Sequence, residues 1–99
     1  MPPNSPLAHI AHVDLERLKW RSRRGMLEND LVLQTFYARH GDSLTEASAA
    51  GLNEVLDLID GDLWDILVHR KILHDVKPDA SAAAHEIITL LHDCEAAKQ

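Results

Sequence analysis

The residues best suited to bind a partner form one short segment, Arg23-Arg24-Gly25-Met26-Leu27-Glu28-Asn29-Asp30. It joins a cationic stretch to an acidic one, with a glycine between them. The guanidinium of Arg24 can form two parallel hydrogen bonds with a carboxylate, and Glu28 is expected one turn into the following helix. Gly25 has no Cβ, so another backbone or a flat ligand can approach it closely. The segment is therefore predicted to be a contact surface.

Trp20 strengthens this prediction. It is expected off the apolar face that Leu15 and Leu18 form, and a large aromatic side chain among exposed cations is typical of a binding hot spot. Five of the ten Lys and Arg residues lie within eight positions around it: Arg17, Lys19, Arg21, Arg23 and Arg24. A basic run is more often only a solvated helix face, and Gly25 could serve only a turn. The residues alone leave a contact role and plain turn chemistry open.

Seven histidines raise the question of a metal site. His9 and His12 are close in sequence, but they fall in an expected tail. His85 and His92 share a helix face, where seven residues separate them by about 10 Å along the axis. They cannot share a zinc ion, because each Zn–N bond is only about 2 Å long. The sequence contains no closed ligand set, so no metal site is predicted.

Cys94 and the acidic residues near position 60 have simpler explanations than catalysis. Cys94 lies on the apolar face of the last expected helix, where a buried thiol is usually inert. The aspartates at 57, 60, 62 and 65 lack the spacing of a calcium loop. Asp60 and Asp62 are expected instead, with Gly61, to end one helix and cap the next. No catalytic residue is predicted.

Helical periodicity predicts an all-α fold, a small five-helix bundle with short loops. The first helix is expected over about 15–23 with Asp14 as its cap, and the second over about 27–40. Gly41 is expected in the position that follows a helix C-terminus. Five residues are expected to line one apolar side of the second helix: Leu27, Leu31, Leu33, Phe36 and Tyr37.

The three remaining helices have clear start signals. Thr45 can begin the third, or Ser43 can, with Glu46 completing a capping box. Pro78 separates the fourth from the fifth, which begins near Asp79 or Ser81. The strongest helical spacing belongs to the third: Leu52, Val55, Leu56 and Ile59. The fourth contains Leu63, Trp64, Ile66 and Leu67, with Trp64 as a core or interface anchor. The fifth carries Ala84, Ile87, Ile88, Leu91 and Cys94.

The length of 99 residues allows one small domain with a single core. A flexible tail is expected over residues 1–12, with three prolines among its first six residues, and a helical domain over 13–97. The net charge of −6 is uneven: residues 1–24 carry +3 and residues 25–99 carry −9. A phosphate backbone would be repelled by most of this surface, which disfavours a nucleic-acid partner.

Cysteine usage and hydropathy bear on location. A single cysteine fits a reducing compartment. No apolar run approaches the roughly 20 residues that span a bilayer, and the first residues lack the features of a secretory signal. We expect a cytoplasmic protein without direct membrane insertion.

Several of these residues form a combination that resembles a known family. The pattern Trp20-x-x-Arg23-Arg24-Gly25-Met26-x-Glu28-x-Asp30, followed by Phe36 and by Asp60-x-Asp62-Leu63-Trp64, resembles the succinate dehydrogenase assembly factors of the SdhE type. These are also described as FAD assembly or flavinylation factors. The resemblance covers roughly residues 14–93. It departs from the family at Ile66, where many members have a second aromatic residue.

The resemblance implies a five-helix bundle that binds the flavoprotein subunit of succinate dehydrogenase and, in some bacteria, that of fumarate reductase. It implies a non-enzymatic role, promoting covalent attachment of FAD to a histidine of that subunit. In the family, the Arg-Gly-x-x-Glu element faces the flavoprotein, which carries over to Arg24, Gly25 and Glu28. The same role extends to the remaining residues of the pattern: Trp20, Arg23, Met26 and Asp30.

No Gly-rich dinucleotide fingerprint is present, so this chain is expected to bind no FAD tightly and to act on FAD held by its partner. Two other functions are compatible with the residues. One is a small regulatory interaction module, of the toxin–antitoxin kind, without any flavoprotein role. The other is a helical DNA-binding protein that uses the basic stretch, which the acidic remainder of the chain disfavours.

Overall fold

The computed structural model describes residues 9–23 and 25–97. Arg24 and residues 1–8 of the expected tail lie outside the described residues. Within the described ranges the chain is helical and contains no strand, only an isolated bridge between His9 and Thr45. The expectation of an all-α fold is confirmed.

Five of the helices in the described ranges have eight or more residues: α1 (His12–Arg21), α2 (Leu27–His40), α3 (Glu46–Leu56), α4 (Asp60–Leu67) and α6 (Ala82–Ala97). A short 3₁₀ turn, η1 (Gly41–Ser43), follows α2, and a four-residue helix, α5 (Leu73–Val76), follows α4. The sequence pattern does not predict α5, because four residues are too few to show a helical period.

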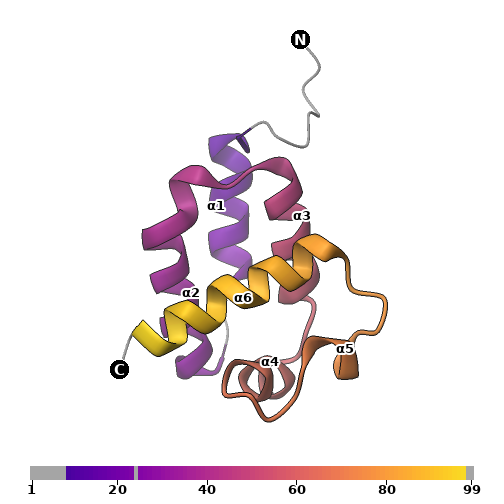
Figure 1. Cartoon of the computed structure of the whole chain (residues 1–99). Coiled ribbons are helices and arrows are strands. Elements are labelled where there is room, and N and C mark those ends of the chain that lie inside the picture. Colours follow the sequence, from indigo (N-terminus) through magenta and orange to yellow (C-terminus); the bar gives the residue numbers. More distant parts are fainter. Residues whose placement is uncertain (1–8, 24, 98–99) are drawn as a thin grey trace.

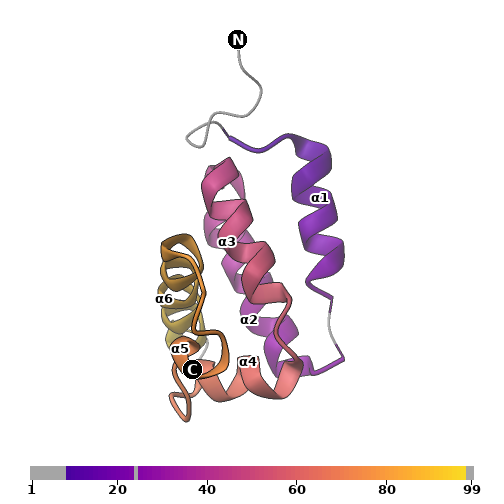
Figure 2. The ribbon, with the colours of Figure 1, turned by 90° about the vertical axis from the view of Figure 1, so that its right-hand side faces the viewer.

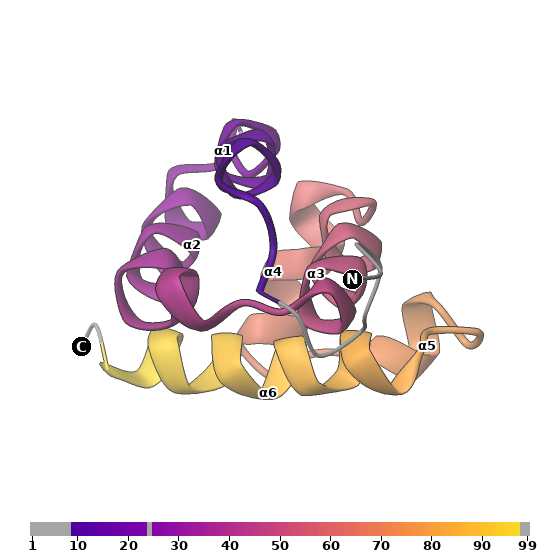
Figure 3. The same ribbon diagram turned by 90° about the horizontal axis from the view of Figure 1, so that it is seen from above.

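The helices form three layers. In Figure 2, α6 lies on one side, α2 and α3 stand in the middle, and α1 lies on the other side. Figure 3 shows that α6 runs across both α2 and α3, whereas α1 covers the space between them from the opposite side. The fourth helix, α4, closes the end of the bundle at which the loop between α1 and α2 lies (Figure 2). This loop is the segment that the sequence marked as a contact surface.

The core confirms most of the expected apolar positions. The five expected residues of α6 are buried: Ala84, Ile87, Ile88, Leu91 and Cys94. The expected apolar side of α2 is partly wrong, because Leu27 is 64% exposed and Leu31 is 42% exposed. Leu33 and Phe36 of the expected set are buried, and so is Val32, because the side of α2 that faces α6 and α4 is rotated away from Leu27 and Leu31.

Two helix starts agree with the sequence. The Thr45 hydroxyl accepts a hydrogen bond from the Ser48 amide at 3.2 Å and caps α3, whereas Ser43 belongs to η1. The Ser81 hydroxyl accepts one from the Ala84 amide at 3.2 Å and precedes α6. Both are local contacts between residues three apart, which a sequence pattern can reveal.

Three expectations about helix ends are wrong. The first helix, α1, begins at His12 with Ala11 at its N-cap, so Asp14 lies inside it. Gly41 has a φ of −56° and continues into η1 rather than adopting a left-handed conformation. The third helix ends at Leu56, and Asp60 and Asp62 lie within the first turn of α4 rather than capping it. Their side chains make tertiary contacts that local spacing does not reveal.

Gly51 sets the distance between α3 and α6. A Cβ at this position would lie 2.5 Å from the carbonyl carbon of Ala83 and 2.6 Å from its oxygen. Gly51 is buried, and the two nearest atoms that a Cβ there would meet belong to the backbone, which cannot rotate away. The two helices can therefore pack this closely only because residue 51 has no side chain.

We expect Gly51→Ala to lower the free energy of unfolding by about 1–3 kcal/mol through overpacking, although alanine is the better helix former. Gly61→Ala is the matched control, because a Cβ there would meet nothing within 4 Å. That variant should be as stable as the parent or more stable. Urea denaturation of the three proteins measures the difference, and equal midpoints for Gly51→Ala and the parent would show that the contact is not constraining.

Side-chain hydrogen bonds hold α1 against the middle layer. The buried Ser22 hydroxyl donates to the Leu18 carbonyl at 2.7 Å and forms a hydrogen bond of 2.6 Å with the Tyr37 hydroxyl. Burial raises the pKa of the Tyr37 hydroxyl, and the Ser22 hydrogen bond offsets part of this effect. On the other flank, Arg21 donates to the Asn53 side chain at 2.8 Å and pairs with Asp57.

Alkaline pH should weaken the fold. Burial raises the pKa of the Cys94 thiol as well as that of Tyr37. Between the unfolded and folded pKa of each group, the folded chain keeps a proton that the unfolded chain has lost. The free energy of unfolding therefore falls as pH rises above about 9. Urea denaturation between pH 7 and 10.5 should show this fall, and Tyr37→Phe should flatten it above about pH 10. An unchanged slope in Tyr37→Phe would argue against a buried, protonated tyrosine.

Candidate functional site

The predicted contact residues lie at the end of the bundle where α1 passes into α2. We define residues 20–30 as the contact segment; it comprises the end of α1, the connecting loop and the first turn of α2. In Figure 2 this loop lies beside the start of α4. Arg24, at its centre, is outside the described residues, so the geometry concerns the residues on either side of it.

Trp20 is the most exposed large hydrophobic residue of the described chain, with 73% of its surface accessible. As the sequence predicted, it points away from the apolar face of α1, where Leu18 is buried. The guanidinium carbon of Arg23 lies 5.5 Å from the centre of the indole ring, a cation–π distance. The two side chains therefore form one exposed aromatic and cationic surface.

Gly25 is exposed, and the fold does not require a glycine there. None of the described glycines has a positive φ, so the backbone at residue 25 is accessible to any L-amino acid. A Cβ would come no closer than 3.8 Å to another atom, the Asp60 Oδ2, which is an ordinary van der Waals contact. The absence of a side chain therefore keeps the outer surface open rather than satisfying the interior. This favours close approach by a second molecule.

Asp60 anchors the contact segment to α4. Its Oδ2 accepts a hydrogen bond from the Met26 amide at 3.3 Å. The buried Asn29 side chain donates to the Asp60 carbonyl oxygen at 3.0 Å and to its Oδ1 at 3.4 Å. Asp60 thus replaces a cap for α2, whose N-cap, Met26, makes no side-chain capping bond. The sequence does not reveal this role of Asp60, because 34 residues separate Asp60 from Met26.

The two acidic residues of the contact segment lie on different sides of α2. Glu28 and Asp30 are two residues apart, which places them about 200° apart around a helix. Glu28 is exposed in the first turn, where the helix dipole favours a carboxylate. Asp30 is half-buried and faces α1. The structure therefore brings Gly25, Met26 and Asp60 together, and leaves Glu28 directed to solvent.

The basic run does not form a uniform cationic face. Arg21, on the side of α1 that faces α3, forms an ion pair with Asp57. The guanidinium of Arg17 lies 3.9 Å from the carboxylate of Asp14. Both line a hollow between α1 and α3 in which carboxylates are also present. Lys19 and Arg23 lie on the side of α1 that faces α2. Within the described residues, carboxylates of the fold therefore neutralise the charges of Arg17 and Arg21 but not the whole basic run.

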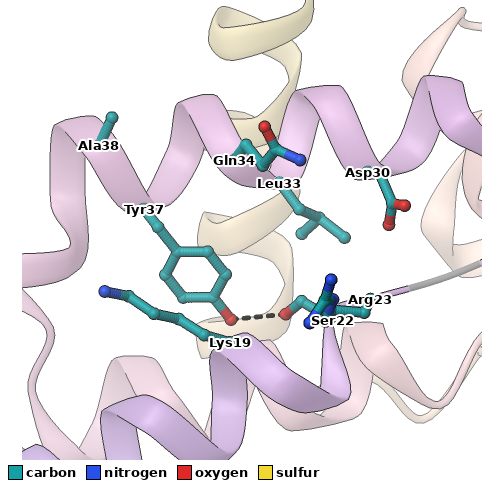
Figure 4. Close-up of a pocket in the computed structure, with 8 residues that line it drawn as sticks. All are labelled: Lys19, Ser22, Arg23, Asp30, Leu33, Gln34, Tyr37 and Ala38. Atoms are coloured by element: carbon teal, nitrogen blue, oxygen red, sulfur yellow. Dashed lines mark hydrogen bonds between the residues drawn. The ribbon is translucent and has the colours of Figure 1, made fainter.

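A cleft of about 430 Å³ separates α1 from α2 (Figure 4). The end of α1 contributes Lys19, and the residues that follow it contribute Ser22 and Arg23. The remaining lining residues belong to α2: Asp30, Leu33, Gln34, Tyr37 and Ala38. The hydrogen bond between Tyr37 and Ser22 joins its two walls (Figure 4). We call it the α1–α2 cleft. It begins at the contact segment, with which it shares Ser22, Arg23 and Asp30.

Other candidate chemistry is not assembled in the described residues. Within residues 9–23 and 25–97, no group of three or more His, Cys, Asp or Glu is arranged to hold a metal ion. His85 and His92 line one hollow with His69 and His74, and the His69 and His92 rings stack with centres 4.3 Å apart. Burial and a raised thiol pKa make Cys94 a poor nucleophile. In the same part of the chain, no helix has the length and apolar character to cross a bilayer.

Comparison with known proteins identifies relatives of this chain. A protein from Ralstonia nicotianae named FAD assembly factor SdhE is 42% identical over 55 residues, covering 56% of this chain and 58% of the relative. A Coxiella burnetii protein of the same name is 37% identical over 78 residues, covering 79% of this chain and 82% of the relative. A mitochondrial succinate dehydrogenase assembly factor 2-B from Drosophila ananassae is 38% identical over 92 residues, covering 92% and 52%.

The matches cover 58% of the length of the Ralstonia protein and 52% of the length of the Drosophila protein. The chain thus spans between about half and three-fifths of these two relatives. No solved structure matches it significantly. The model of the family described as flavinator of succinate dehydrogenase matches residues 16–94, which include the whole contact segment from Trp20 to Asp30. The chain therefore belongs to the flavinator of succinate dehydrogenase family.

Proposed function

We propose that this protein is an assembly factor that binds the flavoprotein subunit of succinate dehydrogenase and promotes covalent attachment of FAD to it. The observation that carries the proposal is the exposed Gly25, which the fold does not require, in the contact segment of a chain from this family. The names of the bacterial and mitochondrial relatives support the same role. The flavoprotein subunit of fumarate reductase is a further partner within this proposal.

The chemistry belongs to the partner in this mechanism. Covalent flavinylation would form a bond between a histidine nitrogen and a methyl carbon of the flavin. The methyl group and the histidine would each lose a proton, and the isoalloxazine ring would take up the electron pair and be left two-electron reduced. The flavoprotein holds both reactants, including the FAD, so their orientation can supply most of the acceleration. A helical protein without a catalytic nucleophile acts by fixing a mobile part of its partner in the reactive arrangement.

Each residue of the contact segment has a role in this mechanism. Gly25 lets the partner's backbone approach, and Arg24 and Glu28 form charge-assisted hydrogen bonds on either side of it. Trp20 buries its exposed ring against the partner, and Asp60 holds the loop in place through Met26 and Asn29. A cytoplasmic location is part of the proposal and is supported by the single, reduced cysteine.

Gly25→Arg should keep the fold and abolish binding to the flavoprotein. The backbone conformation tolerates a side chain, and the exposed position gives the arginine room, so circular dichroism and thermal melting should match the parent. The flavin fluorescence of the denatured flavoprotein on a gel should fall to the level of cells that lack the protein. Gly25→Ala should produce a smaller loss in the same direction.

Ala82→Arg is the matched control, because it places the same side chain at the exposed start of α6. It should support normal flavinylation. Normal flavinylation in cells that carry only Gly25→Arg would refute the proposed function. Recovery of an unrelated partner by co-purification, without any flavoprotein, would favour the regulatory interaction module instead.

A further inference from the structure

We propose that the α1–α2 cleft receives an acidic segment of the flavoprotein that carries an apolar side chain, so that the partner contact continues from Gly25 along α2. This inference rests on the proposed function. It adds a second binding element, in which six of the eight described lining residues lie outside the family pattern, and it specifies the chemistry of the partner segment.

The rim of the cleft carries unneutralised positive charge. Lys19 and Arg23 line it, and neither forms an ion pair with a described residue. Arg17 and Arg21 lie on the side of α1 that faces α3, and both are within ion-pair distance of aspartates. Asp30 is the one carboxylate among the eight described lining residues, and it engages in interactions of its own. The cleft therefore attracts a carboxylate-bearing segment.

The base of the cleft is apolar. Leu33 is 1% exposed and lies between the two walls (Figure 4). The Tyr37 hydroxyl is already engaged with Ser22, so its ring presents an apolar surface to the cleft. Ala38 and the stem of Lys19 extend this surface. A side chain that enters the cleft must therefore be apolar, with its acidic neighbours near the rim.

The outer edge of the cleft continues the contact segment. Leu27 and Leu31 are 64% and 42% exposed and stand on successive turns of α2. Gln34 follows one turn later and lines the cleft. This stripe begins two residues after Gly25, so a partner that contacts Gly25 meets it next. An apolar stripe beside a polar, charged rim has the composition of a protein interface.

Site-specific photo-crosslinking tests the inference with the apo flavoprotein subunit of succinate dehydrogenase as the probe. Benzoylphenylalanine at Gln34, which is exposed in the cleft, should crosslink to a flavoprotein peptide that is net negative and contains a large apolar residue. The same group at Glu86, exposed on α6, should not crosslink. Crosslinks from Gln34 only to a second copy of this chain, or to a peptide without acidic residues, would overturn the inference.

Removal of single charges gives an independent measurement. Lys19→Gln should weaken binding of the apo flavoprotein by about three- to fivefold at low salt, and the difference should shrink at high salt. Arg17→Gln removes the same charge on the α3 side and should change the dissociation constant by less than about twofold. Equal effects of the two variants would exclude the cleft as a docking site.

The two proposals fail in different ways. If Gly25→Arg abolishes binding while Gln34 yields no crosslink and Lys19→Gln behaves like Arg17→Gln, the proposed function stands and the cleft inference is wrong. If Gly25→Arg leaves binding and flavinylation intact, the proposed function itself is wrong.

Discussion

The close contact between Gly51 and the backbone of Ala83 is the constraint on which the arrangement of the helices depends. It brings α3 against the start of α6, so that α6 can run across both α3 and α2. The buried side chains of α6 then complete the core, from Ala84 to Cys94. Helix α1 packs on the other face of the middle layer. It contacts this face through the buried Leu18 and through the hydrogen bonds of Arg21 with Asn53 and of Ser22 with Tyr37. A side chain at residue 51 would separate these layers.

A second interaction connects this core to the proposed contact surface. Asp60 begins α4 and also binds the Met26 amide and the Asn29 side chain at the start of α2. The loop at Gly25 is thereby attached to two helices of the bundle. Asn29 is fully buried, and its Oδ1 has no hydrogen-bond partner among the described residues. A buried oxygen without a hydrogen bond lowers the stability of the fold. The hydrogen bonds that the Asn29 amide nitrogen donates to Asp60 offset part of this loss. Loops that are held in this way lose less entropy when a partner binds.

The fold also decides which cations are available for binding. Arg21 is used by the fold itself, since it ties α1 to Asn53 and Asp57 on α3. Lys19 and Arg23 lie on the opposite flank, at the rim of the α1–α2 cleft. Trp20 lies between Lys19 and Arg21 in sequence and faces solvent. One basic run therefore has two physical functions, structural on one side of α1 and available for a partner on the other.

The sequence by itself determined the features that depend on neighbouring residues. It predicted the bounds of α2, the Thr45 cap, the buried face of α6 and the exposure of Trp20, because these follow from periodicity and contacts within one turn. From residue types it also predicts a contact role for the contact segment, and this stays a prediction. The tertiary structure decided the role of Asp60, the exposure of Leu27 and Leu31, and the division of the basic run. These features arise from contacts between residues more than 30 positions apart and from the rotation of each helix about its axis, which only the packed core sets.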